Sequence, residues 1–253
     1  MHEGKVETSN ERILLNRLQE SIGAQQNDYL GMQTLSDLVR DKGLDVWPRT
    51  LRLFGQSCII ANDILLAADP GTGVGGYKNS LSGSFTYPAG RTPCSIMIAH
   101  GKTIYGGSCH GHVGKPETVL YRLQDGSFGT LRTMYAADLP AGVRWAVGGL
   151  GLCDMHDPEA EGFCRLQFGG KWYDYSDVLR KTNHTVLGCK GQQVYLIYCR
   201  DMTGAQVQQL IRDRFKLDHA IMLDGGSLAA INGAEDFAQI NLGTRQGYLI
   251  QGV

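Results

Sequence analysis

The run Ala220-Ile221-Met222-Leu223-Asp224-Gly225-Gly226-Ser227 decides how this sequence is interpreted. Its four apolar residues predict a buried strand, and the carboxylate of Asp224 follows where that strand ends, a place where polar side chains often reach a cleft. The two glycines remove side-chain bulk, so that a ligand can approach the backbone, and their amides can form a nest for an anion. The turn also suits a type I′ hairpin, which is the alternative without a functional role.

The segment before this run predicts a helix. Thr203 is a good N-cap, and four apolar residues then recur on one helical face. These residues are Val207, Leu210, Ile211 and Phe215. The order of helix, strand and Asp-Gly-Gly-Ser turn favours a functional site over an isolated hairpin.

From residue 51 onward, short apolar or β-branched runs alternate with turns, which is typical of strands. Gln124-Asp125-Gly126-Ser127 predicts a hairpin turn between two of them. The predicted strands are 58–67, 94–99, 118–123, 145–152, 163–168, 185–189, 193–199 and 220–223, with 247–251 as an edge strand.

Residues 1–50 differ from the rest of the chain. Apolar residues at helical spacing predict two amphipathic helices there, one around 13–22 and one over about 34–42. We therefore expect two parts, an N-terminal helical extension over residues 1–50 and one domain over residues 51–253. The expected fold class is α+β, with a mixed, mostly antiparallel β core and packed helices.

Composition excludes several classes of protein. Glycine supplies 34 of the 253 residues, well above an ordinary share of about 7%. The formal net charge of −1 provides no basic field for a nucleic acid polymer, and 42% hydrophobic residues are unlike a disordered chain. No apolar stretch approaches the length of a membrane span, and the N-terminus lacks the apolar core of a signal peptide. We expect a cytoplasmic protein by default; non-classical export or association with a virion stays open.

Other motifs carry less weight. Gly71–Gly76 satisfies G-x-G-x-x-G, but no helix is predicted to begin there, so we interpret it as a surface loop. Cys109–His112 and Asp154–Asp157 concentrate metal-ligating side chains without the spacing of a zinc site. No cofactor is required by these motifs, while a divalent metal at the Asp224 turn stays an alternative. The seven cysteines, none in a C-x-x-C spacing, predict free buried thiols.

Four segments, taken in order, resemble motifs of the phosphodiester glycosidase family. Ser82-Gly83-Ser84-Phe85 resembles its early N-G-x-F element, and residues 145–152 resemble its central A-x-G-G-x-x-L strand. His184–Gly188 resembles its R/H-T-A-I-G strand, and residues 220–227 resemble its C-terminal signature. The resemblance covers about residues 80–250.

Three departures from the family pattern stand beside this resemblance. Ser82 takes the place of an asparagine, and His184 stands where arginine is frequent. Two glycines, where the family usually has three, follow Asp224.

The resemblance implies a hydrolase that cleaves a glycosyl phosphodiester between the anomeric carbon and the phosphate oxygen, with a small molecule or a glycan as the substrate. Such chemistry needs a carboxylate beside the oxocarbenium-like centre and donors for the phosphate oxygens. We expect Asp224 to be the key carboxylate, His184 to titrate near neutral pH or to bind phosphate as the cation, and Thr185 to orient either. The expected substrate-binding residues are Ser82, Gly83, Ser84, Gly148, Gly149, Arg200, Gly225, Gly226 and Ser227.

Two alternatives from other classes stay open. One is a catalytically inactive module that binds a sugar phosphate or a nucleotide-like ligand. The other is a structural protein that forms a homo-oligomer through its N-terminal helices. On the enzymatic hypothesis, glycines from separate segments approach one shared ligand; they are Gly83, Gly148, Gly149, Gly188, Gly225 and Gly226.

Overall fold

The computed structural model divides the chain into two compact units, Met1–Trp47 and Pro48–Val253. In the first unit, β1 (Glu3–Lys5) and β2 (Tyr29–Gly31) form an antiparallel pair. The two stretches of that unit predicted as amphipathic helices lie outside the described residues. The structure describes residues 3–5, 29–31, 48–68, 79–83, 93–107, 116–153, 165–168, 171–174, 180–233 and 248–253.

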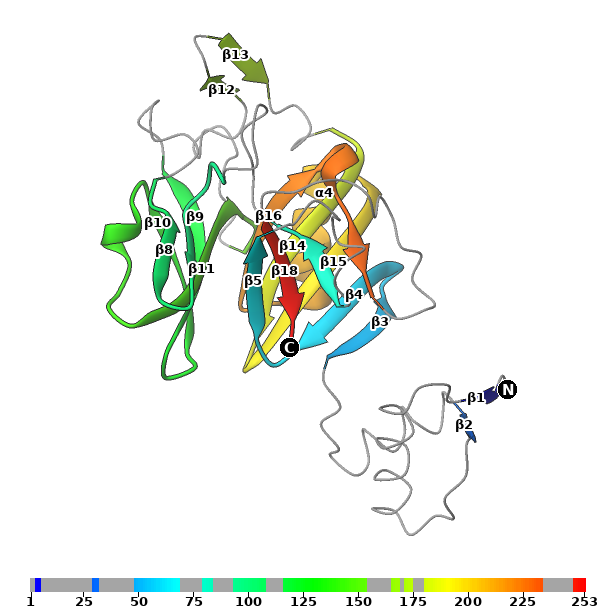
Figure 1. Ribbon diagram of the computed structural model, residues 1–253. Helices are drawn as coiled ribbons and strands as arrows, with labels where there is room; N and C mark the ends of the chain where they lie inside the picture. Colours follow the sequence, from blue (N-terminus) through cyan, green and yellow to red (C-terminus); the bar gives the residue numbers. More distant parts are fainter. Residues whose placement is uncertain are drawn as a thin grey trace. The chain divides into compact units, whose positions relative to one another are not determined.

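The second unit is built on a ten-stranded sheet. In chain order its strands are β3 (Arg49–Leu53), β4 (Gln56–Ala61), β7 (Met97–Ala99), β8 (Lys102–Tyr105), β9 (Glu117–Leu123), β10 (Phe128–Thr133), β11 (Val143–Gly151), β14 (Thr182–Lys190), β15 (Gln193–Met202) and β16 (His219–Gly225). Their order in the sheet is β10-β9-β11-β16-β14-β15-β4-β3 (Figure 1). Off this path, β7 pairs with β11, and β8 pairs with β7. The pairings along this path are antiparallel.

A four-stranded sheet forms the second layer. Its strands are β5 (Ile64–Ala68), β6 (Ser80–Ser82), β17 (Ile231–Asn232) and β18 (Tyr248–Gly252), in the order β17-β6-β18-β5. The prediction that 247–251 forms an edge strand is wrong, because β18 lies between β6 and β5. A separate antiparallel pair joins β12 (Arg165–Phe168) to β13 (Lys171–Asp174).

The predicted hairpin turn at residues 124–127 is confirmed between β9 and β10. Gly126 has φ +92°, the left-handed region that glycine enters without a steric penalty. Asp125 Oδ1 accepts a 2.9 Å hydrogen bond from Ser127 N, which adds to the backbone bonds Leu123 N to Ser127 O (2.8 Å) and Gly126 N to Leu123 O (3.1 Å) that close the turn. Local chemistry alone therefore specifies this hairpin.

The helix after Thr203 is also confirmed at its start. Thr203 caps α4 (Gly204–Leu210) through a capping box with Gln206, whose Oε1 accepts a 2.9 Å bond from Thr203 N. Beyond residue 210 the helix continues as a π-turn, Ile211–Phe215, so the single long α-helix that we expected is divided. The other helical turns of the described residues are short, η3 (Ala136–Asp138) and η5 (Gly226–Leu228). None of the helices that the structure describes has the length and apolar character to cross a membrane.

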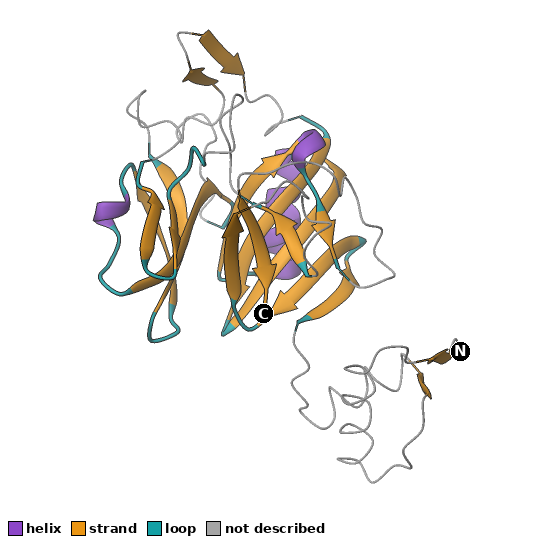
Figure 2. Cartoon of the chain, in the orientation of Figure 1, coloured by secondary structure: helices purple, strands orange, loops and turns teal. Residues whose placement is uncertain are grey.

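The α+β expectation is therefore wrong. Within the described residues the fold is mostly antiparallel β, with α4 as its one α-helix, and the N-terminal unit shows a strand pair where we expected a helical extension (Figure 2). The physical reason lies in what covers the large sheet. One face is covered by a second sheet, so that only the other face needs a helix, and α4 packs there against β15.

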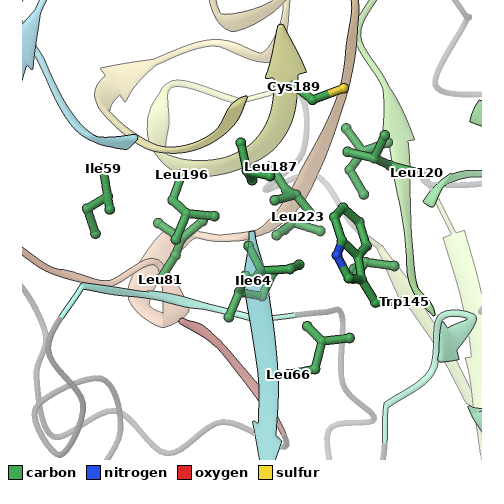
Figure 3. Close-up of a cluster of buried hydrophobic side chains, with 14 of the residues drawn as sticks. Ile59, Ile64, Leu66, Leu81, Leu120, Trp145, Leu187, Cys189, Leu196 and Leu223 are labelled. Carbon is green, nitrogen blue, oxygen red and sulfur yellow. The ribbon is translucent and has the colours of Figure 1, made fainter. Parts of the chain in front are cut away.

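The inter-sheet core is the main cluster of buried apolar side chains (Figure 3). The large sheet contributes alternate residues of β14, β15 and β16, because successive side chains along a strand point to opposite faces of the sheet. The four-stranded sheet contributes residues from each of its strands, among them Ile64, Leu66, Leu81, Ile231 and Ile250. The two layers therefore share one core.

Asp63 stabilises the connection between β4 of the large sheet and β5 of the small one. Its carboxylate lies 2.9 Å from Arg122 Nη1 and 2.7 Å from Arg144 Nη2, and it accepts bonds from Trp145 Nε1 at 2.7 Å and Ile64 N at 2.9 Å. Asp63 and Arg122 have side chains only 11% and 12% exposed, so this ion pair is shielded from water, unlike that of the half-exposed Arg144.

We expect Asp63→Asn to lower the free energy of unfolding by about 3 kcal/mol, because it leaves a largely buried guanidinium without its counter-charge. Urea unfolding followed by tryptophan fluorescence measures this change. The matched control is Asp213→Asn, which removes an exposed ion pair with Arg212 and should cost below about 0.5 kcal/mol. Equal losses for the two variants would contradict the assigned role of Asp63.

The described cysteines are free thiols. Cys58, Cys94, Cys189 and Cys199 are buried, and Cys153 is half-buried. Burial raises the pKa of the Cys199 thiol to about 12, and burial followed by the nearby Asp218 carboxylate raises the pKa of Cys189 to about 12. Burial, together with the nearby Cys199, also raises the pKa of Cys58 far above its usual range.

Alkylation should therefore separate these thiols. At pH 8, iodoacetamide should modify Cys153 about tenfold or more faster than Cys189 and Cys199, because those two thiols hold their protons until the pH approaches their raised pKa values. Peptide mass spectrometry of native and urea-unfolded samples provides the comparison. Rapid labelling of Cys199 in the native protein would mean that the large sheet opens readily around β15, the strand that carries this thiol.

Candidate functional site

The candidate site is built around the end of β16. A bulge sets β16 against β14 there, since Val186 pairs with Met222 while His184 pairs with Gly225. Thr185 Oγ1 donates a 2.7 Å hydrogen bond to the backbone oxygen of Asp224, and Gly225 N donates a 2.9 Å bond to Asp224 Oδ1. The side chain of Asp224 is half-buried, so the bulge presents a fixed carboxylate at the edge of the core.

The turn after Asp224 has the backbone that its glycines predict. Gly226 has φ +63°, and it begins the 3-10 turn η5, in which Ser227 is exposed. A Cβ atom on Gly225 would lie 2.9 Å from Asn183 O and 3.3 Å from His184 Nδ1. Gly226 is therefore needed for its left-handed backbone conformation, and Gly225 is needed because β14 leaves no room for a side chain.

His184 lies beneath this turn and is fully buried. Its Nε2 lies 2.8 Å from Met202 O, and because a carbonyl oxygen only accepts, Nε2 carries the proton. The imidazole is thus hydrogen-bonded to the end of β15, and its Nδ1 lies close to Gly225. Its expected roles, titration near neutral pH or binding of phosphate as the cation, stay predictions for a side chain that the structure places in the interior.

The start of β14 and the end of β15 form the rim beside the turn. Asp201 has φ +52° in a bulge of β15, where its N–H donates a 3.2 Å bond to Asn183 Oδ1. Lys181 Nζ lies 3.1 Å from Asp201 Oδ2 in an exposed pair. Arg200 is exposed next to this bulge, on a strand that β14 separates from β16.

Tyr198 adds a buried hydroxyl next to Thr185, its partner across β14 and β15. Tyr198 Oη is buried and has no hydrogen-bond partner within the described ranges. Burial raises the pKa of this phenol above its usual value, so the hydroxyl remains a neutral donor at physiological pH.

Ser82 and Gly83 approach the site from the second layer. Ser82 N donates a 2.9 Å bond to Ala230 O, and Ala230 N donates a 3.0 Å bond to Ser82 Oγ. These bonds hold β6 against the segment that follows η5. Gly83 packs directly on the backbone of Tyr248 in β18, and Ser84 lies outside the described residues.

Gly148 and Gly149 lie on β11, where their roles are in strand packing. A Cβ on Gly149 would lie 2.6 Å from Met222 O, and a Cβ on Gly148 would overlap the carboxylate of Glu117. Gly188 is similar, since its Cβ would lie 2.9 Å from His219 O. These contacts account for the three glycines through the approach of neighbouring strands; contact with a shared ligand stays a prediction.

Sequence reasoning missed two buried polar residues of the second unit, Ser95 before β7 and Glu117 at the start of β9. Both are fully buried, and Glu117 Oε1 accepts a 2.6 Å hydrogen bond from Ile96 N. The available signal for Glu117 is one acidic residue directly after Pro116, at the head of an apolar strand. Ser95 carries no comparable signal.

The described residues contain no group of three or more His, Cys, Asp or Glu side chains placed to hold a metal ion. Cys109–His112 and Asp154–Asp157 lie outside those residues, as does the glycine-rich run 71–76. Among the described residues, the site offers the half-buried carboxylate of Asp224, several hydroxyl groups and backbone amides.

Comparison with known proteins finds similar structures but no similar sequences. No protein-family model matches the chain, and no curated protein is significantly similar to it. Its structure is similar to the catalytic domain of zebrafish N-acetylglucosamine-1-phosphodiester alpha-N-acetylglucosaminidase, auto-inhibited by its pro-peptide, with a TM-score of 0.50 and 14% identity over 81% of each chain. A hypothetical protein from Synechocystis aligns with 81% of this chain and 61% of its own, with a TM-score of 0.47 and 8% identity. The chain thus has a distant structural relationship to a phosphodiester glycosidase catalytic domain.

Proposed function

We propose that this protein is a hydrolase that cleaves glycosyl phosphodiesters. The observation that carries the proposal is the bulge at the end of β16, which fixes the half-buried carboxylate of Asp224 beside a turn whose Ser227 is exposed. The likeness of the fold to a phosphodiester glycosidase catalytic domain supports the same chemistry.

In the proposed reaction, the bond between the anomeric carbon and the phosphate oxygen breaks, and water supplies a hydroxyl group to the sugar and a proton to the released phosphate monoester. Asp224 stabilises the positive charge that develops at the anomeric carbon or removes the proton of the attacking water. The phosphate oxygens lie against the amides of the Gly225–Ser227 turn and the hydroxyl of Ser227. Because a phosphate monoester is a good leaving group, strong general-acid assistance is not required.

We propose that Thr185 and His184 position this carboxylate. Thr185 donates a hydrogen bond to the backbone oxygen of Asp224. His184 is buried beneath the turn, where its bond to Met202 O keeps the ring in place. Gly225 and Gly226 keep the turn open to the ligand, while Ser82 and Gly83 fix the second layer behind it. Ser84, Gly148, Gly149 and Arg200 remain predicted contacts of the more distant parts of the substrate.

The test is hydrolysis of a panel of methyl phosphodiesters of glucose, galactose and N-acetylglucosamine 1-phosphates in water labelled with ¹⁸O. We expect the label in the sugar, because the bond to the anomeric carbon breaks. Label in the phosphate would indicate an ordinary phosphodiesterase, and absence of turnover with every member of the panel would refute the proposal. Retention of an intact diester without turnover, measured by calorimetry, would favour the inactive binding module.

A further inference from the structure

Strand β11 has two successive neighbours along one edge. Near its middle it pairs with β7 through Ala146 and Val147, and Gly148 N donates a 2.7 Å bond to Ile96 O. Two residues later, Leu150 pairs with Met222 of β16. The edge of β11 therefore passes from β7 to β16 at Gly148–Gly149, and we call this place the fork.

The fork brings two distant segments together. Since each residue of a strand advances about 3.3 Å, the start of β7 and the end of β16 lie about 7 Å apart along β11. Ser95 directly precedes the paired residue Ile96, and Asp224 follows the paired residue Met222 by two positions. The two side chains therefore belong to chain segments that leave the sheet at the same place.

Ser95 is held rigidly at the fork. The amide N–H of the next residue, Ile96, donates a 2.6 Å bond to Glu117 Oε1, and the Ile96 carbonyl accepts from Gly148. Ser95 itself is fully buried, and within the part of the chain that the structure describes its Oγ has no hydrogen-bond partner. A buried hydroxyl without a partner is unfavourable, so a rigid one calls for an explanation beyond packing.

We infer that Ser95 is a ligand-binding residue of the Asp224 site and that its hydroxyl donates a hydrogen bond to a phosphate oxygen of the bound glycosyl phosphodiester. This inference rests on the proposed function. A hydroxyl bond to an anionic oxygen is stronger than one between neutral groups, and it satisfies the donor that the free protein leaves unpaired. The bound substrate thereby compensates for the unfavourable burial of the hydroxyl.

Thermal unfolding tests the first half of the inference. Ser95→Ala should leave Tm unchanged or raise it, because no intramolecular bond is lost. The matched control is Ser82→Ala, in a serine equally buried whose Oγ accepts a bond from Ala230 N; it should lower Tm by several degrees. Ser95→Cys keeps the volume and serves if the alanine variant packs poorly. A drop for both Ser95 variants as large as that of the control would overturn the inference.

Kinetics and binding test the second half. Against the best diester of the panel, Ser95→Ala should lower kcat/KM by about tenfold to a hundredfold, as expected for one hydrogen bond to a charged group. In an Asp224→Asn background, the intact diester should raise Tm less when Ser95 is also replaced by alanine. Wild-type values in both measurements would overturn the inference.

The two proposals can fail separately. If wild-type protein hydrolyses the diester and Ser95→Ala does so equally well, the proposed function stands and the role of Ser95 is refuted. If nothing is hydrolysed but the diester protects the protein only when Ser95 is present, the enzymatic function fails and the ligand contact stands. If no member of the panel protects wild-type protein more than Ser95→Ala, the role of Ser95 is refuted as well.

Discussion

Replacing Asp224 with asparagine should lower kcat for a glycosyl phosphodiester by about 10³-fold or more. Asparagine keeps the oxygen that accepts the bond from Gly225 N, but it removes the charge that stabilises an oxocarbenium-like centre. The bonds from Thr185 and around the bulge involve the backbone, so the geometry of the turn should persist. We therefore expect a free energy of unfolding within about 1 kcal/mol of wild type. Steady-state kinetics and urea unfolding of the same preparation measure both quantities.

Asp201→Asn is the matched control for this change. Asp201 lies on the rim of the same site, but its carboxylate is exposed and pairs only with the exposed Lys181 among the contacts described above. An exposed pair contributes little, so kcat should change less than about threefold. Equal activity losses for the two variants would indicate a general effect of negative charge at the rim, and full activity of Asp224→Asn would remove this residue from the mechanism.

Adding one methyl group at Gly83 should destabilise the protein by about 3 kcal/mol. A Cβ there would lie 2.8 Å from the carbonyl carbon of Tyr248 and closer still to its oxygen, and both atoms belong to the backbone of β18. A backbone cannot rotate away as a flexible side chain can, so β6 and β18 must separate. That separation also strains the paired hydrogen bonds between Ser82 and Ala230, next to the Asp224 turn.

Gly106→Ala is the control for Gly83→Ala. Its Cβ would meet only the Thr103 side chain, at 3.5 Å, and the glycine has no positive φ, so we expect a change within about 0.5 kcal/mol. Differential scanning calorimetry of both variants gives the comparison. A Gly83→Ala protein as stable as wild type would show that the two strands can move apart at little cost.

Features that depend on nearby residues were correctly predicted from the sequence. The Asp125–Gly126 hairpin and the Thr203 N-cap are confirmed, since a short side chain and a glycine with positive φ determine each within a few residues. Most predicted strands also exist, among them β9, β11 and β14. Alternation of apolar residues is a local property, and it survives in any fold that buries one face.

Features that depend on which distant strand a segment pairs with were not predictable from local sequence patterns. The single strand that we expected over 58–67 is two strands, β4 and β5, which belong to different sheets. The change of direction occurs at Asn62–Asp63, where the carboxylate of Asp63 collects its partners from β9 and β11. Neither the break nor its partners has a signature in the local composition.

The sequence by itself determined the strands, the hairpin turn, the start of α4 and the position of Asp224 at a strand end. The tertiary structure alone decided that a second sheet covers the core where we expected helices, that His184 is buried, and that the segments carrying Ser95 and Asp224 leave the large sheet at one fork. Local patterns follow from the conformational preferences of single residues, which act over a few positions. Which strands become neighbours depends on burial and backbone pairing between distant segments, and a linear pattern does not record them.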